Sequence, residues 1–464
     1  MSILSNMLYL PLGQFTMRDI ANLKNELTVL PKSFAADKFH GKQPVIRLYA
    51  DAPGMIGVPK AWGREHYSVT EDRRSSGHPI SCPKRPDPNH PRVREPAKQA
   101  KFMADLLNAA RTQESFIASA STGSGKTVCA LNMAAELGRT TLIVVHLDRL
   151  LDQWVGEIKE KLGLTDDEIG IVQGPKCDFK GKKIVVGMLQ SLSLKGYPDE
   201  LYSYFGTVVF DEVHKIGSEH FSKAVSLFNA KVTVGLSATV RRRDGADKVF
   251  LYHLGQVTVR SEAEALPTEV YVIPYLSGNE APHREAHRSV KMEYLTSDFD
   301  RNHLIATQII KMHRAGRQAL VVGDSIEHLY VIRDLCAESI PEDHMGMFTG
   351  EGIVDGKRKK HTSEHLEAVK ANSQIIFATY QMITEGIDIP RLDAGIDITP
   401  RNDAEQLIGR IRRPMPGKKT PVWVTIVDRC VNSFDHAFNS RMKDYLGTCC
   451  KVTMMRPVGG CNGR

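Results

Sequence analysis

The chain has 464 residues, of which 42% are hydrophobic and 25% are charged, as in a folded protein. At roughly 100–200 residues per domain this length predicts two to four domains. No stretch approaches the roughly 18 apolar residues that a membrane-spanning helix needs, and the start lacks the pattern of a signal peptide, so we expect a cytoplasmic location. The eight cysteines form no Cys-x-x-Cys pair, which argues against a zinc ribbon and suits a reducing compartment. The formal net charge of +7 is compatible with a nucleic-acid partner but does not identify one.

The first 90 residues are expected to form a small N-terminal α+β domain. Residues 43–50 read as a strand, 51–54 as a turn and 55–59 as a returning strand, which together predict a hairpin. Residues 71–93 are charged and carry five prolines, so they are predicted to be a linker or an extended surface segment. We place the first domain boundary near residue 90.

Strands and helices alternate after that boundary. Short apolar strands are predicted at 116–120, 141–145, 183–187, 207–210 and 232–236, with helices at 126–137 and 149–161. The second half repeats the pattern, with strands at 319–322, 373–378 and 422–427 and helices at 325–339 and 362–371. Buried parallel strands separated by helices predict sheets covered on both faces. We therefore expect two tandem α/β domains, 91–265 and 266–464, joined within 262–290.

A glycine-rich loop joins the strand at 116–120 to the helix at 126–137. It consists of Ala120, Ser121, Thr122, Gly123, Ser124, Gly125, Lys126 and Thr127. Gly123 and Gly125 let the backbone approach phosphates, and a helix N-terminus favours anions. Lys126 is expected to reach the β- and γ-phosphates of ATP, and Thr127 to ligate Mg²⁺. A chance glycine-rich turn is the alternative, which the strand–loop–helix order disfavours.

Two carboxylates, Asp211 and Glu212, directly follow the strand at 207–210. The carboxyl end of a buried parallel strand is where ligands bind in such sheets. Asp211 is expected to hold Mg²⁺, and Glu212 to orient or deprotonate the attacking water. Read alone, the two residues would more simply cap a strand; after a phosphate loop, a catalytic role is favoured.

The phosphate loop and the Asp-Glu-x-His motif together resemble those of superfamily 2 helicases, and the resemblance extends over residues 94–430. It implies that Gln99 reads adenine and that residues 144–154 and 188–192 touch the nucleic-acid backbone, through Arg149 and Gln190. His146 stands where the family usually has proline. Coupling of ATP turnover to strand movement is implied for His214, Ser237, Ala238 and Thr239.

Two further motifs lie in the second domain. Residues 378–390 resemble motif V, which implies a DNA contact at Thr379 and nucleotide contacts at Gly386 and Asp388. Residues 406–414 resemble motif VI. Its Gln406, Gly409, Arg410 and Arg413 recur at intervals of three and four, which predicts one shared helical face. Two guanidiniums on that face could stabilise charge on a transferring phosphoryl group. If the two arginines stood without the other motifs, a basic helix face exposed to solvent would be the favoured interpretation. Nucleotide bound between two domains would close and reopen the cleft.

Residues 235–245 resemble the XPB-like and type III restriction-like branch, and residues 45–62 resemble a hairpin ahead of the motor in UvsW-like phage helicases. The resemblance implies two RecA-like domains that use ATP and Mg²⁺ to remodel branched DNA, by fork regression and Holliday junction branch migration. The setting would be phage replication, recombination and repair in the cytoplasm of a bacterial host, alongside other replication or recombination proteins. The motor subunit of a restriction complex, an RNA helicase and a nucleotide-gated clamp stay open as alternatives.

Several other features each allow two interpretations. Arg242 and Arg243 are candidates for DNA contact, with a solvated loop as an equal alternative. The basic cluster at 357–361 could grip phosphates or form a solvated loop. Tyr380 could stack on a base, although core packing is favoured. We expect a loosely packed end from residue 448 to 464.

Overall fold

The structure is a computed structural model. It describes residues 1–31, 45–89, 96–120, 125–213, 218–237, 246–261, 266–354, 357–384, 389–401, 405–447 and 450–459. Contacts divide the chain into two compact units, Met1–Ala263 and Glu264–Arg464. Each unit is described by itself below.

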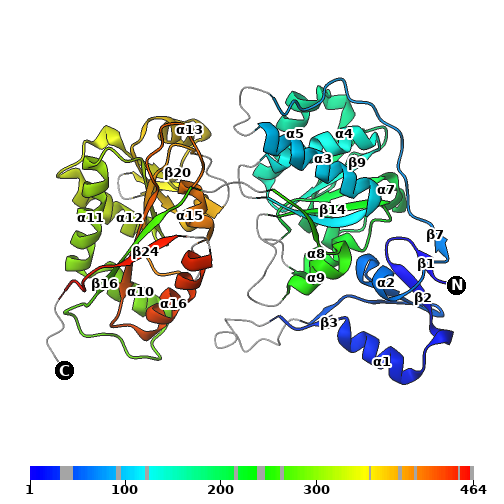
Figure 1. The fold of residues 1–464 in the computed structure, drawn as a ribbon, viewed down its shortest axis with the longest axis horizontal. Coiled ribbons are helices and arrows are strands. Elements are labelled where there is room, and N and C mark those ends of the chain that lie inside the picture. The colour runs from blue at the N-terminus through cyan, green and yellow to red at the C-terminus, as the bar shows by residue number, and fades with distance from the viewer. Residues whose placement is uncertain are drawn as a thin grey trace. The chain divides into compact units, whose positions relative to one another are not determined.

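Unit 1 begins with a five-stranded sheet of order β5-β6-β2-β1-β7 (Figure 1). Its strands are β1 (Ile3–Leu4), β2 (Leu8–Pro11), β5 (Ala50–Ala52), β6 (Met55–Val58) and β7 (Glu71–Asp72). The helices are α1 (Met17–Glu26), which begins with a capping box between Thr16 and Asp19, and α2 (Lys60–His66). The small pair β3 (Thr28–Val29) and β4 (Ile46–Arg47) lies apart. The predicted hairpin is confirmed as β5–β6, but the strand predicted at 43–50 was wrong: β4 covers only Ile46–Arg47, and β5 starts at Ala50.

The main sheet of unit 1 has the order β11-β10-β12-β9-β13-β14-β8-β15. All neighbours run parallel except β10 and β11. The strands are β8 (Ser115–Ser119), β9 (Thr141–Val145), β10 (Ile169–Gln173), β11 (Lys176–Cys177), β12 (Ile184–Met188), β13 (Thr207–Phe210), β14 (Val232–Ser237) and β15 (Val257–Arg260). The helices are α3 (Pro96–Thr112), α4 (Lys126–Leu137), α5 (Asp148–Leu162), α6 (Leu189–Leu194), α7 (Asp199–Tyr204), α8 (Ser218–Val225) and α9 (Asp247–Leu254).

Both faces of this sheet are covered. One face packs against α3, α4 and α5, with Leu106, Leu131 and Ile158 in its core. The core of the other face includes Phe221 and Phe250 from α8 and α9, and it continues into the N-terminal sheet through Leu8, Ile56 and Trp62 of α2. The N-terminal sheet and the main sheet thus share one hydrophobic core, which explains why they form one compact unit.

The proline-rich segment after β7 is an extended strap on unit 1. Ser75 forms a parallel bridge with Ala230, and Pro79 an antiparallel one with Arg139. The backbone N–H of Lys84 donates to the carbonyl of Leu162 at 3.0 Å. Of the two alternatives for this segment, the extended surface segment is therefore the one observed over its described part.

Unit 2 contains a seven-stranded parallel sheet of order β18-β21-β17-β22-β23-β16-β24. The strands are β16 (Glu269–Tyr275), β17 (Ala319–Gly323), β18 (Met345–Phe348), β21 (Ile375–Thr379), β22 (Ala394–Asp397), β23 (Val422–Asp428) and β24 (Lys451–Met454), with a separate hairpin of β19 (Glu351–Val354) and β20 (Lys357–Lys360). The helices are α10 (Arg288–Thr296), α11 (Phe299–Arg314), α12 (Ile326–Ala337), α13 (Ser363–Asn372), α14 (Tyr380–Thr384), α15 (Glu405–Ile411) and α16 (Asn432–Gly447). The fold is the predicted one: two tandem RecA-like domains with a small N-terminal α+β part.

One expectation for unit 2 was wrong. The tail was expected to be loosely packed, but β24 pairs in parallel with β16 and Val458 bridges to Tyr275, because β16 would otherwise be an open sheet edge. The two units meet at Ala263 and Glu264, within the segment 262–290 expected to join the domains, and β16 occupies part of that segment. In addition, Tyr380 lies in the core, as favoured, and its hydroxyl donates to the carbonyl of Thr399 at 2.7 Å.

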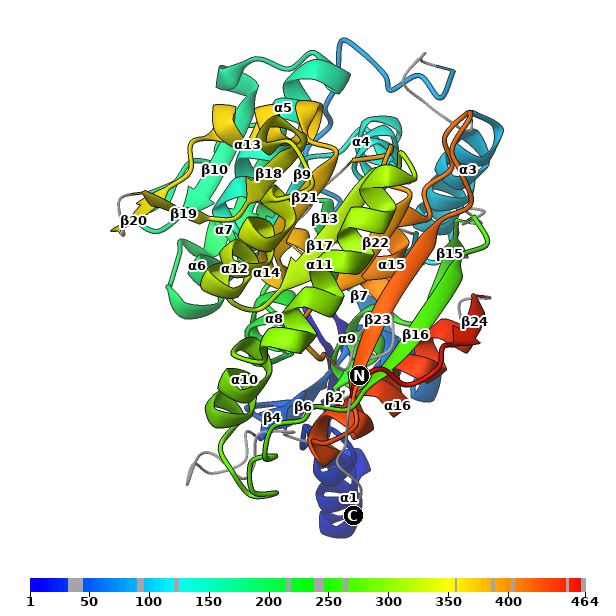
Figure 2. The same ribbon diagram turned by 90° about the vertical axis from the view of Figure 1, so that its left-hand side faces the viewer.

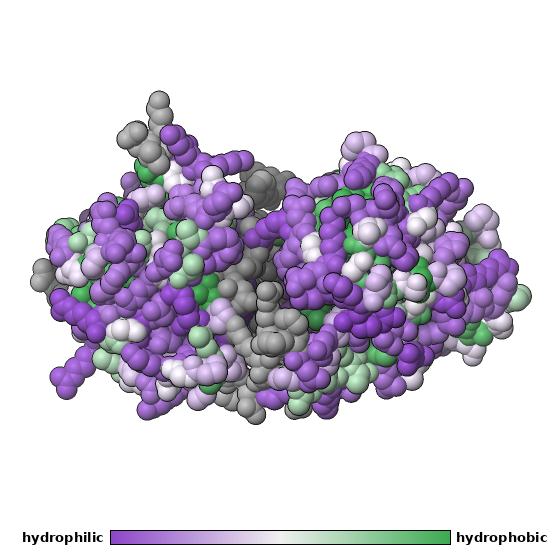
Figure 3. Space-filling model, turned by 90° about the horizontal axis from the view of Figure 1, so that it is seen from above, coloured by the Kyte–Doolittle hydropathy of each residue, from purple (hydrophilic) through white to green (hydrophobic). Residues whose placement is uncertain are grey.

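The surface seen from above is mostly hydrophilic, with scattered hydrophobic residues (Figure 3). Within the described part of the chain, no helix combines the length and apolar character needed to cross a membrane.

Candidate functional site

The predicted motifs of unit 1 gather at one edge of its main sheet. Strands β8, β9, β12, β13 and β14 are parallel, so their carboxyl ends lie together. The phosphate loop, Gln190 and Asp211 follow the ends of β8, β12 and β13. Some predicted residues lie outside the described ones: Ser121, Thr122, Gly123, Ser124, His214, Ala238, Thr239, Arg242, Arg243, Gly386 and Asp388. The side chain of Gln406 is likewise not described.

The described end of the phosphate loop is Gly125, Lys126 and Thr127. Gly125 has φ 81° and ψ 24°, a left-handed conformation that glycine adopts without strain, and α4 begins at the next residue. Lys126 is buried, and its Nζ donates to the carbonyl of Ala120 at 2.9 Å. The same Nζ lies 3.5 Å from Oε1 of Glu212. The ammonium thus stands between the loop and the carboxylates after β13, at the N-terminus of a helix.

Asp211 and Glu212 form the acidic half of the site. Asp211 is buried, and the indole Nε1 of Trp154 in α5 donates to its Oδ2 at 2.9 Å. Glu212 has a positive φ of 50°, which is uncommon for a side-chain-bearing residue and is found at functional sites. Burial raises the pKa of Asp211 to about 6, with the neighbouring charge of Glu212 adding to the rise, while Trp154 and Lys126 lower it.

This combination fits a divalent cation. Burial destabilises the negative charge of a carboxylate, and a raised pKa means that neighbouring protein groups offset this cost only in part. A Mg²⁺ ion held through one or two carboxylates and phosphate oxygens would supply the missing positive charge. Asp211 is therefore the residue that suits the metal, with Thr127 at the start of α4 beside the phosphate loop.

Two further residues contact the phosphate loop. Gln99, in α3, lies against Gly125 so closely that a Cβ there would be 2.2 Å from its Nε2. It also hydrogen-bonds Cys129, whose thiol pKa burial raises to about 12. The buried Ser237 pairs with Ser119 across β14 and β8, and its carbonyl accepts the N–H of Ala120 at 2.9 Å. The start of the Ser-Ala-Thr motif is thus bonded to the start of the loop.

The predicted nucleic-acid contacts of unit 1 are exposed. Arg149 lies in the first turn of α5, after the carboxyl end of β9. Gln190 follows β12, and its Nε2 donates to the carbonyl of His146 at 3.1 Å, joining two neighbouring loops. Trp154, five residues after Arg149 in the same helix (154 − 149), closes the segment expected to touch nucleic acid, but no contact with Asp211 was predicted for it. In the sequence this tryptophan resembles any aromatic residue on the buried face of a helix. Its hydrogen bond to Asp211 is therefore evident only in the structure.

The motif V and VI residues lie in unit 2. Thr379 ends β21, and its Oγ1 accepts the N–H of Met382 at 3.5 Å. Arg410 is 4% exposed and donates to the carbonyl of Ile383 at 2.9 Å; Arg413 is 8% exposed. A solvated basic face does not fit this burial. The expectation of one shared helical face was wrong for Arg413, because α15 ends at Ile411 and a residue before proline, here Pro414, disfavours the helical conformation.

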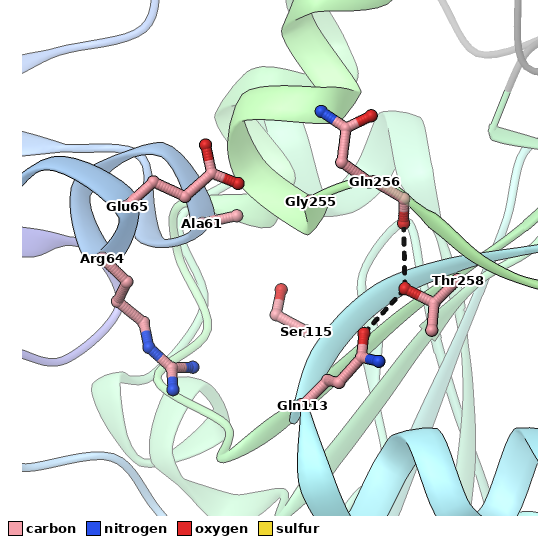
Figure 4. Close-up of a pocket in the computed structure, with 8 residues that line it drawn as sticks. All are labelled: Ala61, Arg64, Glu65, Gln113, Ser115, Gly255, Gln256 and Thr258. Carbon is pink, nitrogen blue, oxygen red and sulfur yellow. Dashed lines mark hydrogen bonds between the residues drawn. The ribbon is translucent and has the colours of Figure 1, made fainter.

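A separate pocket of about 280 Å³ lies at the amino ends of the strands of the main sheet, opposite the phosphate loop (Figure 4). It is lined by Ala61, Arg64 and Glu65 of α2 and by Gln113, Ser115, Gly255, Gln256 and Thr258. The hydroxyl of Thr258 donates to Oε1 of Gln113 at 2.7 Å. Since Ser115 begins β8 and the phosphate loop follows its other end, this pocket is not part of the nucleotide site.

Comparisons with known proteins agree with these motifs. Residues 92–242 match the family model "Type III restriction enzyme, res subunit". L396 of Acanthamoeba polyphaga mimivirus, whose name ascribes to it ATP-dependent RNA helicase activity, is 26% identical over 91% of this chain and 80% of its own length. D10 of Escherichia phage T5, named as a helicase, is 26% identical over 72% of each chain. The DNA 3'-5' helicase XPB of Kineococcus radiotolerans is 24% identical over 68% of this chain and 57% of its own length.

Among solved structures, the fragment of a protein of Vibrio vulnificus YJ016 assigned as an HsdR subunit of a type I restriction enzyme has a TM-score of 0.53. It is 15% identical and is covered over 68% of its length, against 77% of this chain. At this identity the likeness supports the fold alone. The predicted similarity to the XPB and type III restriction branch is confirmed, and D10 adds a phage helicase to the relatives.

Proposed function

Because this chain belongs to the superfamily 2 helicases, in their XPB and type III restriction-like branch, we propose that it is an ATP- and Mg²⁺-dependent motor that remodels branched DNA. The observation that carries the ATP-dependent part is the group formed by Lys126, Asp211 and Glu212 at the carboxyl edge of the main sheet. Fork regression and branch migration in phage replication, recombination and repair are the proposed tasks, which the relationship to phage T5 D10 and to XPB favours.

Each residue of the site has a definite proposed role. Lys126 binds the β- and γ-phosphates, and Asp211 together with Thr127 holds the metal. Glu212 orients the attacking water and accepts its proton. When bound, ATP supplies the phosphoanhydride bond and Mg²⁺ neutralises charge on the phosphates. Arg410 and Arg413 stabilise charge on the transferring phosphoryl group, a role in which their planar donor forks are effective.

The hydrogen bond between Ser237 and Ala120 supports the proposed coupling of ATP turnover to movement of the nucleic-acid strand. Strand β8 leads into the phosphate loop and pairs with β14, which ends at Ser237, so this bond joins the nucleotide loop directly to the Ser-Ala-Thr motif. Helix α5 carries both the exposed Arg149 and Trp154, which donates to Asp211. A nucleic-acid contact at Arg149 is therefore linked to the proposed metal site through this one helix.

An RNA helicase is the second candidate, because the name of the mimivirus relative L396 points that way. The motor subunit of a restriction complex is the third, because the matching family model is the res subunit of type III restriction enzymes. For that role a partner would supply the nuclease.

One substrate panel separates these functions. ATPase and strand-rearrangement rates are measured on linear duplex, forked and four-way DNA and on single-stranded RNA. The proposal expects the largest stimulation, and fork regression by the chain alone, on branched DNA. Stimulation by RNA only would establish the RNA helicase, and ATP-driven translocation without regression would favour the restriction motor.

Two variants serve as internal controls for the panel. Lys126→Ala should abolish ATP turnover, whereas Glu212→Gln should bind ATP but turn it over at least about 100-fold more slowly, since general-base catalysis contributes 10²–10⁴-fold. Turnover retained in Lys126→Ala would overturn the proposed site.

A further inference from the structure

The hairpin β19–β20 leaves the carboxyl edge of the unit 2 sheet beside the expected nucleic-acid contact at Thr379. Strands β18 and β21 are parallel neighbours, with Phe348 paired to Ala378. Thr379 is the next residue after Ala378, and β19 begins at Glu351, three residues after Phe348 (351 − 348). Figure 2 shows the hairpin at the margin of unit 2, outside the sheet.

The hairpin is basic, and only some of its cationic side chains form ion pairs with carboxylates. Residues 351–360 contain four cations and two carboxylates. Arg358 forms an ion pair with Glu327 of α12 and lies 3.8 Å from Glu351, so much of its charge is compensated. Lys359 and Lys360 are exposed, and among the described residues no carboxylate lies within ion-pair distance of either ammonium.

The base of the hairpin is fixed on unit 2. The hydroxyl of Thr349 donates to the carbonyl of Glu351 at 2.6 Å, and the N–H of Ile353 donates to the hydroxyl of Tyr330 at 3.1 Å. Gly352 lies so close to His361 that a Cβ would be 2.6 Å from its Cε1. A hairpin anchored in this way presents its lysines at a defined place, unlike the solvated loop that was the sequence alternative.

Lys359 and Lys360 are consecutive residues of a strand, so their side chains leave opposite faces of the hairpin. A two-stranded ribbon of this kind fits the major groove of a duplex, which is about 12 Å wide and walled by two phosphate backbones. We propose that the β19–β20 hairpin inserts between two backbones of the nucleic acid, with Lys359 against one and Lys360 against the other. This inference rests on the proposed function, since it extends the nucleic-acid path from Thr379.

Salt dependence of binding tests the arrangement directly. Each phosphate contact contributes about 0.9 to the slope of log K against log salt on duplex DNA and about 0.7 on a single strand. The double variant Lys359→Ala/Lys360→Ala should therefore lower the duplex slope by about 1.8. On a single strand, where only one backbone is present, the loss should be about 0.7. Affinities are measured by fluorescence anisotropy over a range of salt concentrations, with DNA of both forms and the full chain.

The matched control is Lys311→Ala/Arg314→Ala. Both side chains are exposed, and they lie at the end of α11, before the amino end of β17, on the opposite edge of the sheet. This control should keep the parent slope on both DNA forms. Thermal unfolding of both double variants checks that the fold is retained, and the charge reversal Lys359→Glu/Lys360→Glu should enlarge the effect if it is electrostatic.

The outcomes separate this inference from the proposed function. An unchanged duplex slope in Lys359→Ala/Lys360→Ala, with salt-dependent binding by the parent, overturns the hairpin contact and leaves the proposed function standing. A loss of about 1.4 on a single strand would place both lysines on one backbone and overturn the insertion. A parent chain that neither binds nucleic acid nor is stimulated by it overturns both proposals.

Discussion

The indole Nε1 of Trp154 donates a 2.9 Å hydrogen bond to Oδ2 of Asp211, and both side chains are buried. The tryptophan thereby links the helix that carries Arg149 to the carboxylate expected to hold Mg²⁺. A donor to an ionised carboxylate lowers its pKa, and that bond opposes the rise caused by burial.

Trp154→Phe is expected to move the acidic limb of the ATPase pH profile to higher pH. Removing the donor destabilises the ionised form of Asp211, so its pKa rises above the present value of about 6. More of the enzyme is then protonated near neutral pH, and kcat/KM should fall more at pH 6.5 than at pH 8.5. The pH dependence of kcat/KM reports groups of the free enzyme and is the measurement to make.

Unit 2 supplies the control for that variant. Trp423 Nε1 donates to Oδ1 of the buried Asp397, also at 2.9 Å, in the same type of pair but within the core of unit 2. Trp423→Phe should lower stability by about 1–3 kcal/mol, the usual penalty for a buried polar group left without its partner, and leave the pH profile in place. An identical pH shift in both variants would mean that Trp154 acts only on stability.

Lys60 predicts a pH dependence of stability for unit 1. Its ammonium is buried between the carbonyl of Phe228 and the hydroxyl of Thr233, and burial lowers its pKa from 10.5 to about 7. Between these values the folded chain binds fewer protons than the unfolded chain, so stability rises with pH. The rise between pH 7 and pH 9 should be about 2 kcal/mol, measured by denaturant unfolding.

Lys60→Met tests the assignment of that rise. Methionine retains the apolar stem and removes the titrating group, so the stability of the variant should change about 2 kcal/mol less than the parent over the same pH interval. A variant with the parent's pH dependence would show that other groups cause it.

Arg410 and Arg413 should affect catalysis more than nucleotide binding. Alanine at either position is expected to lower kcat by about 10³-fold or more, the range for removal of an arginine finger. Arg413→Lys should rescue little, because lysine lacks the planar fork. Arg412, whose Nε donates to the carbonyl of Leu266 at 3.1 Å, is the matched control, and Arg412→Ala should retain kcat. Nucleotide affinity and kcat are measured separately; a near-parent kcat in Arg413→Ala would remove it from the site.

Local patterns explain why much of the fold was predictable. The bounds of β9, β13 and α4 agree with those predicted, because a short apolar run between turn residues and a glycine-lysine helix start are encoded within a few residues. The phosphate loop, Asp211 and Glu212 were predictable for the same reason. Parallel order then brings them to one sheet edge.

The parts that sequence reasoning missed depend on contacts between distant residues. Strand β16 contains Pro274, which disfavours a central strand, yet two partner strands stabilise it. The bond from Trp154 to Asp211 and the end of α15 before Arg413 depend on how helices pack and terminate. The pairing of the tail with β16 depends on an open edge far away in the chain.

The close approach of Gly77 to Gly206 predicts how much the contact between the strap and unit 1 contributes to stability. Gly77 has φ 63°, and a Cβ there would be 2.2 Å from the backbone nitrogen of Gly206, which begins the approach to β13. Gly77→Ala must therefore displace the strap from unit 1 as well as adopt a left-handed backbone. We expect a loss of about 3 kcal/mol or more in the free energy of unfolding. Gly181→Ala isolates the backbone cost, because Gly181 has φ 76° but no neighbour within 4 Å of a Cβ, and it should lose only about 1–2 kcal/mol. Denaturant unfolding of both variants measures the difference, and equal losses would show that the strap does not depend on this contact.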